Sequence, residues 1–134
     1  MAARSENINL IKKSYKKKII LIDRFTDSTI AYQHYGMGVD LNLIKNLNKH
    51  LLKDIKVNFT FLNTVSSKNL YKRLKKRKSL NRYDKFNRNF YNKVQKGFIK
   101  LSNLHKKKYL KVNSNLNIKY NEKLVLTKIM NLIK

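Results

Sequence analysis

The sequence predicts an α/β fold in which a parallel sheet is flanked by helices. Two observations carry this prediction. Short runs rich in β-branched and aromatic residues alternate with longer segments of helical periodicity, which is the order that parallel sheets require. The first of these runs, Ile19–Ile22, is apolar without interruption, which is typical of a strand buried on both faces. A chain of 134 residues suffices for one domain with a modest core, so residues 1–134 are treated as a single domain.

The first half of the chain is expected to contain three helices and one strand. Ile8, Ile11 and Tyr15 share one helical face and indicate the first helix. The sequence GMG at positions 36–38 separates the next two helices. The predicted elements are a helix over residues 2–15, a strand over 19–22, a helix from 27 to about 35 and a helix over 41–52.

The second half is expected to contain two strands and three helices. Ser66 or Ser67 can cap the first of these helices, because a hydroxyl oxygen accepts a hydrogen bond from the first turn. Phe90, Val94 and Leu101 mark the apolar stripe of a longer helix. The predicted elements are a strand over 56–64, a helix to about 78, a helix over 82–104, a strand over 108–113 and a helix over 120–133.

Composition alone leaves two interpretations of the charge open. The chain carries 32 Lys and Arg residues against 7 Asp and Glu, a formal net charge of +25. Such a charge is typical of proteins that bind nucleic acid, including small ribosomal proteins. Joint enrichment of Lys, Asn and Ile is equally expected from an A/T-rich coding sequence, whatever the function. Because the charge is spread along the whole chain, we expect only non-specific contact with nucleic acid.

Several function classes are excluded by what the sequence lacks. There is no cysteine, which excludes disulfides and thiolate metal sites. No apolar run approaches the length of a membrane span, and the basic amino terminus lacks the apolar region of a secretory signal. We therefore expect no membrane contact and a cytoplasmic location, either the bacterial cytosol or the interior of an organelle.

The segment DRFTDSTIAYQHYGMGVD, residues 23–40, is the candidate functional site. In open parallel sheets, ligands bind beyond the carboxyl ends of the strands, which is where Asp23 and Arg24 would stand. The planar fork of Arg24 suits a phosphate, because it can meet two oxygens at once. Asp23 can hold that arginine in place or hold a water molecule on a metal ion.

The helix behind this loop carries a polar face. Residues four apart on a helix face the same way, so Ser28 pairs with Tyr32 and Thr29 pairs with Gln33. Such hydroxyl and amide groups can read the edge of a nucleotide base. The same residues are also compatible with a capped helix start beside an Asp–Arg surface pair, and at this point both interpretations remain open.

The segment IDRFTDSTIAYQHYGMGVD, residues 22–40, resembles the Asp-Arg-aromatic segment of thymidylate kinases, in which the family pattern runs DRY-x-x-S-x-x-AYQ-G-x-G-x-G-x-D. The resemblance continues in family order over essentially the whole chain. The matching segments are AAR at 2–4, VNFTFLNT at 57–64, the lid and long helix at 72–101, and KYLKVNSNLNIKYNEKLV at 108–125.

The resemblance implies ATP-dependent phosphorylation of dTMP to dTDP, with Mg²⁺ present and with a homodimer as the complete enzyme. Arg24 would grip the dTMP phosphate, and Asp23 would lie beside it near the magnesium ion. The thymine-contacting residues implied are Arg4, Thr29 and Gln33, with Tyr32 packed near the sugar or base. From the lid, one or two of the three arginines Arg73, Arg77 and Arg82 would reach the ATP phosphates. Phosphoryl transfer needs positioning and positive charge, which these residues would supply.

The chain also departs from the family pattern. The substituted positions are His34, Met37, Asn63, Asp84 and Asn113. The family's phosphate loop, G-x-x-x-x-G-K-[ST], does not occur, because the three glycines stand at positions 36, 38 and 97. The chain therefore resembles the carboxyl-terminal two-thirds of the enzyme, truncated at its amino terminus.

This truncation leads to expectations about stability and activity. We expect unpaired strand edges, low stability and no catalysis by the fragment alone. Two alternatives stay open, a basic nucleic-acid-binding protein such as a ribosomal component, and an inactive relic that binds only dTMP.

Overall fold

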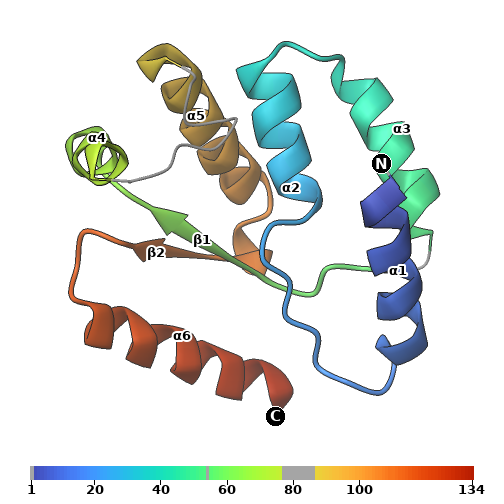
Figure 1. Cartoon of the computed structure of the whole chain (residues 1–134). Helices are drawn as coiled ribbons and strands as arrows, with labels where there is room; N and C mark the ends of the chain where they lie inside the picture. Colours follow the sequence, from blue (N-terminus) through green and yellow to red (C-terminus); the bar gives the residue numbers. More distant parts are fainter. Residues whose placement is uncertain (1, 54, 77–86) are drawn as a thin grey trace.

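A computed structural model describes residues 2–53, 55–76 and 87–134 of the chain (Figure 1). The short π-helix η1 directly continues α2, so the two form one rod. The elements are α1 (Ala2–Ser14), α2 (Thr26–Thr29), η1 (Ile30–Gly36), α3 (Leu41–Leu52), β1 (Thr60–Thr64), α4 (Ser67–Lys75), α5 (Arg88–Leu104), η3 (Lys106–Lys108), β2 (Tyr109–Asn113) and α6 (Ile118–Ile133).

The sheet of the described residues consists of β1 and β2, which run parallel. Their register places Thr60 opposite Tyr109 and Thr64 opposite Asn113. Figure 1 shows α6 on one side of this sheet, with α5 and the α2–η1 rod on the other and with α1 and α3 at one end. The predicted α/β class with a parallel sheet is therefore confirmed.

The predicted strand at Ile19–Ile22 is wrong, because this segment has no strand beside it among the described residues. Its side chains are also not buried on both faces, since Ile19 is 65% and Leu21 78% exposed. A strand exists only through hydrogen bonds to a neighbour, so an apolar run without a partner stays irregular. For the same reason the predicted strand 56–64 narrows to Thr60–Thr64, the part that faces β2.

Helices lie where they were predicted, although the predicted helix from 27 to about 35 is the short α2 continued by the π-helix η1. Side-chain caps set the starts of α3, α4, α5 and α6. Ser66 caps α4, Asp40 caps α3 and Asn87 caps α5, each accepting from a backbone N–H three residues on. Asn117 caps α6, which begins at Ile118 instead of the predicted residue 120. The predicted end of α4 near residue 78 and the predicted start of α5 at residue 82 lie outside the described residues.

The core that positions the candidate site lies between η1 and α5. Ala31, Phe90 and Val94 are buried there, and the half-buried ring of Tyr32 packs against them. Gly97 allows the two helices to approach, because a Cβ atom at this position would lie 2.5 Å from the Tyr35 ring. This close contact holds one face of η1 rigidly against α5.

Candidate functional site

The candidate site begins at the bend that joins residues 19–22 to α2. Arg24 adopts a φ of 60°, in the left-handed region that costs a non-glycine residue about 1 kcal/mol or more. Backbone strain of this kind tends to cluster at functional sites, where the surrounding structure holds it in place. The bend turns the Arg24 side chain toward the α2–η1 rod, on which Tyr32 lies.

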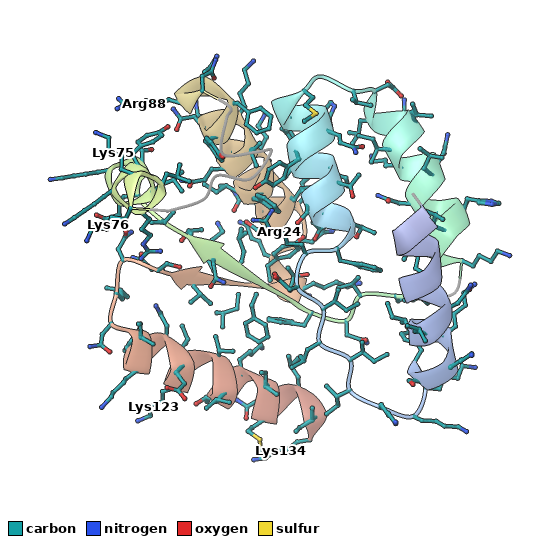
Figure 2. The ribbon with its side chains drawn as sticks, in the orientation of Figure 1. Arg24, Lys75, Lys76, Arg88, Lys123 and Lys134 are labelled. Carbon is teal, nitrogen blue, oxygen red and sulfur yellow. The ribbon has the colours of Figure 1, made fainter. Side chains whose placement is uncertain are left out.

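Arg24 and Tyr32 form the centre of the site. The Arg24 Nη1 donates a hydrogen bond of 3.3 Å to the Tyr32 hydroxyl, and its Cζ lies 5.5 Å from the centre of the Tyr32 ring. The Tyr32 ring in turn makes edge-to-face contacts with Phe90 and Phe98. In Figure 2 Arg24 lies between α2 and the sheet, whereas Lys75 and Lys123 project outward from their helices.

A cavity of about 230 Å³ opens beside this pair, at the carboxyl end of β1. Arg24 and Tyr32 line it together with both polar and apolar groups of β1, α4 and α5. Those further residues are Leu62, Asn63, Thr64, Val65, Leu70, Leu74, Tyr91, Val94, Gln95, Phe98 and Ile99. A basic group thus faces a half-apolar hollow that offers amide and hydroxyl groups, an arrangement suited to an anionic, partly aromatic ligand.

A second and larger hollow, which we name the sheet groove, has a volume of about 1020 Å³. It lies between residues 18–28 and residues 55–63, with the end of α6 and Tyr109 also lining it. Asp23, Arg24, Ser28 and Tyr32 all line this groove. The structure therefore brings together Asp23, Arg24 and the Ser28–Tyr32 pair.

The other predicted residues of this segment do not line either hollow. The Thr29 hydroxyl is buried and makes no hydrogen bond within the described part of the chain. Gln33, its predicted partner one turn on, is exposed. A buried hydroxyl without a partner costs free energy, and neither hollow reaches Thr29.

Of the other predicted arginines, only Arg73 has a described side chain. Arg73 lies on α4 and donates from Nη2 to the Ser114 carbonyl over 2.7 Å, which holds α4 against the loop after β2. Arg77 and Arg82 lie outside the described residues, and Arg4 belongs to the start of α1, residues 2–7, of which only the backbone is described.

A polar contact that the sequence prediction missed joins the start of α2 to the sheet. The Tyr109 hydroxyl of β2 donates a hydrogen bond to the Asp27 carboxylate. Burial raises the pKa of the Tyr109 hydroxyl well above its ordinary value, and the Asp27 carboxylate raises it further. Because Asp27 stands three residues after Arg24, this hydrogen bond attaches the bend at Arg24 to β2.

Two further lining groups could have been found from sequence spacing. Gln95 lies four residues after Tyr91 on α5 and three before Phe98, so these side chains share one helical face. Asn63 and Thr64 end the strand that the sequence did predict, at the edge where parallel sheets bind ligands. Tyr109 carried no such signal, because its partner lies 82 residues away.

The described residues show neither a metal-binding cluster nor a membrane-spanning helix. Among the described residues, no group of three or more His, Cys, Asp or Glu side chains could hold a metal ion. Within the same ranges, no helix has the length and apolar character needed to cross a membrane.

Comparisons with known proteins give a consistent family. A family model described as Thymidylate kinase matches residues 1–125. A thymidylate kinase of Wolbachia pipientis wMel is 50% identical over 82 residues, which are 60% of this chain and 39% of that protein. One from Trichodesmium erythraeum is 37% identical over 103 residues, 75% of this chain and 46% of that protein.

A solved structure agrees with these relatives. The crystal structure of a thymidylate kinase from Ehrlichia chaffeensis superimposes with a TM-score of 0.70 at 28% identity, over 96% of this chain and 60% of that chain. This chain therefore spans less than two-thirds of the length of each of these proteins.

Proposed function

The chain belongs to the thymidylate kinase family, and on that premise we propose that it carries the nucleoside monophosphate site of an enzyme that converts dTMP to dTDP with ATP. The observation that carries the proposal is Arg24, held in a strained bend with its guanidinium against Tyr32 at the mouth of a cavity. Only a ligand with an anionic group makes good use of a cation fixed in this position.

Each residue of the site has a chemical task in this proposal. Arg24 binds the dTMP phosphate through two N–H groups and stabilises the negative charge that moves during transfer. Tyr32 holds the guanidinium in place and packs against the sugar or base. The contacts to the thymine edge that the family resemblance implies for Thr29, Gln33 and Arg4 stay part of the proposal, although neither Thr29 nor Gln33 lines a hollow. The arginines assigned to the lid are Arg73, Arg77 and Arg82.

The residues for ATP are not all present. The phosphate-binding motif G-x-x-x-x-G-K-[ST] does not occur in the sequence, so no step at ATP is assigned to these residues. A magnesium ion in such an enzyme would be held mainly by nucleotide phosphates. In that arrangement Asp23 would orient a water molecule of the ion.

The proposal extends to the complete enzyme. We place it in the bacterial cytosol or in the interior of an organelle, where dTDP supplies DNA synthesis. The homodimer is what the family resemblance implies. The net charge of +25 adds a non-specific attraction for nucleic acid.

Titration calorimetry of the 134-residue chain with dTMP tests the proposal. High salt screens the general attraction of phosphates to the charged surface. We expect dTMP to bind more tightly than dCMP, thymidine or inorganic phosphate. Arg24→Ala should weaken dTMP binding by about 10- to 100-fold, the worth of one charge-assisted pair.

Arg88→Ala is the matched control, because the Arg88 guanidinium lies 4.6 Å from the Tyr71 ring but outside both hollows. It should leave dTMP binding unchanged. If dTMP and inorganic phosphate bound with equal affinity, the binding would reflect only the net charge of the chain. If Arg24→Ala bound dTMP as tightly as the original chain, Arg24 would not be part of the site.

A further inference from the structure

The start of α2 lacks the local support that four other helices of the chain have. Side chains cap α3, α4, α5 and α6, whereas Phe25 at the start of α2 makes no side-chain capping hydrogen bond. The helix directly follows the bend in which Arg24 holds its strained φ of 60°. Because an uncapped helix start leaves backbone N–H groups without partners and frays readily, a contact from outside α2 is needed to hold the bend.

Tyr109 supplies such a contact from the sheet. It is the first residue of β2, and its hydroxyl donates a hydrogen bond to the carboxylate of Asp27 in the first turn of α2. Figure 1 shows the α2–η1 rod on one side of the sheet that β1 and β2 form. Because β2 is paired with β1 from end to end, the Tyr109 hydroxyl extends from a firmly held part of the fold.

The two charged side chains of this region have separate partners. Asp27 is bonded to Tyr109, and Arg24 donates from Nη1 to the Tyr32 hydroxyl, so neither charge neutralises the other. Arg24 therefore keeps its charge and its other N–H groups for a ligand, while Asp27 attaches the backbone behind it to β2. Arg24, Asp27 and Tyr109 all line the sheet groove, which places the three side chains in one part of the molecule.

We propose that Tyr109 is a positioning residue for the phosphate group of dTMP. Through its hydrogen bond to Asp27 it holds the start of α2, and thereby the bend from which Arg24 presents its guanidinium. The proposal rests on the proposed function, in which Arg24 binds that phosphate. Because Tyr109 acts through two other residues and not on the ligand itself, loss of its hydroxyl should weaken only those ligands that carry the phosphate.

A purely structural role of Tyr109 is the competing explanation. The side chain is half-buried, and packing of its ring would support the sheet with or without the hydroxyl. Tyr109→Phe keeps the ring and removes one hydrogen-bond donor, so it separates the hydrogen bond from the packing. A general loosening of the fold would weaken the binding of every ligand of the site, whereas a misplaced Arg24 would weaken only the binding of the phosphate.

Titration calorimetry of the 134-residue chain in high salt, with dTMP and with thymidine, tests the proposal. We expect Tyr109→Phe to weaken dTMP binding by about three- to tenfold, the worth of one hydrogen bond, and to leave thymidine binding unchanged. In the Arg24→Ala background, Tyr109→Phe should cause no further loss of dTMP affinity, because the guanidinium that it positions is gone. An equal loss for both ligands, or additive effects of the two substitutions, overturns the proposal.

Matched variants test the hydrogen bond itself. Asp27→Asn keeps an oxygen that accepts from Tyr109 and should bind dTMP at least as tightly as the original chain, whereas Asp27→Ala removes the acceptor and should match Tyr109→Phe. Tyr120→Phe makes the same chemical change on an exposed side chain of α6 and should leave dTMP binding unchanged. If Asp27→Asn lost as much affinity as Asp27→Ala, the hydrogen bond would not be the link, and the proposal would be wrong.

A measurement without ligand separates this proposal from the proposed function. The NMR order parameter of the Arg24 Nε–Hε group reports how firmly the guanidinium is held, and it should fall in Tyr109→Phe. An unchanged order parameter overturns the positioning role, whatever the ligand does.

The two proposals also fail differently in the binding experiment. If Arg24→Ala weakens dTMP binding and Tyr109→Phe does not, the nucleotide site stands and the positioning role of Tyr109 falls. If Arg24→Ala binds dTMP as tightly as the original chain, both proposals fall.

Discussion

At the scale of single residues, the site depends on how Arg24 is restrained. Its backbone sits in the left-handed region, and its guanidinium both donates to the Tyr32 hydroxyl and lies over the Tyr32 ring. A flexible arginine would lose side-chain entropy on meeting a phosphate, whereas this one has already lost much of it in folding. The strain and the contact therefore favour binding.

Tyr109 offers a test by pH. Its pKa is raised in the folded chain by burial and by Asp27, so its ordinary value of about 10 applies only to the unfolded state. Stability from this group is complete below about pH 10 and is lost as the pH rises toward the folded pKa, because only the unfolded state gives up the proton. As the pH rises from about 9 to about 11, the urea midpoint of Tyr109→Phe should fall less steeply than that of the original chain.

The same variant should be less stable than the original chain at neutral pH, by about 1–2 kcal/mol, since Asp27 loses a donor. Tyr120→Phe is the control, because that side chain is 58% exposed. Parallel pH profiles for the original chain and Tyr109→Phe would contradict the Asp27–Tyr109 bond.

At the scale of elements, the site depends on the packing of η1 against α5. The two helices meet through glycine on both sides, since a Cβ atom at Gly36 would lie 2.6 Å from the Phe90 ring. Tyr32 sits on η1 four residues before Gly36 and reaches Phe90 and Phe98 on α5. A shift of η1 would thus move the acceptor of the Arg24 hydrogen bond.

Gly97→Ala tests this packing. The new methyl group would clash with the Tyr35 ring, so we expect a loss of about 1–3 kcal/mol, although alanine has the better helix propensity. Urea unfolding followed by circular dichroism measures the change. Lys96→Ala, on the exposed side of the same helix, should stay within about 0.5 kcal/mol. If Gly97→Ala proved as stable as the original chain, the close approach would be wrong.

A second substitution identifies the clash. Replacing Tyr35 by leucine in the Gly97→Ala background should recover part of the loss, because it removes the ring that the methyl group meets. Additive effects of the two substitutions would mean that the clash lies elsewhere.

At the scale of the whole molecule, the high net charge and the exposed apolar surface both lower the expected stability of the folded chain. Seven acidic residues cannot neutralise 32 basic ones, so most cations have no carboxylate partner. Leu21, Leu126 and Ile133 are all about half exposed or more. The expected low stability of the isolated chain remains a prediction that these two features support.

Salt dependence tests the charge contribution. Raising sodium chloride from about 0.05 M to about 0.5 M shortens the screening length several-fold, so the urea midpoint of the chain should rise. Sodium sulfate at the same ionic strength is the control. If charge screening alone acts, the two salts shift the urea midpoint equally, whereas exclusion of sulfate from the protein surface would make its shift larger. A midpoint that does not respond to either salt would show that self-repulsion is minor.

The local sequence was sufficient for most of the secondary structure. Helical periodicity and the capping side chain of Ser66 act within a few residues, so they predict helices from the local sequence. The motif at residues 22–40 indicates the family. The alternation of elements also predicted the class of the fold. These features depend on neighbours along the chain, which the sequence displays directly.

Only the tertiary structure decided which segments found partners. Ile19–Ile22 has the composition of a strand, but no strand lies beside it in the described part of the chain, whereas Tyr109 meets Asp27 from 82 residues away. The pairing of Arg24 with Tyr32 likewise depends on how the α2–η1 rod lies against the bend before it. Strand pairing and the Asp27–Tyr109 contact join residues that are far apart in the sequence, and no local pattern shows whether both partners meet.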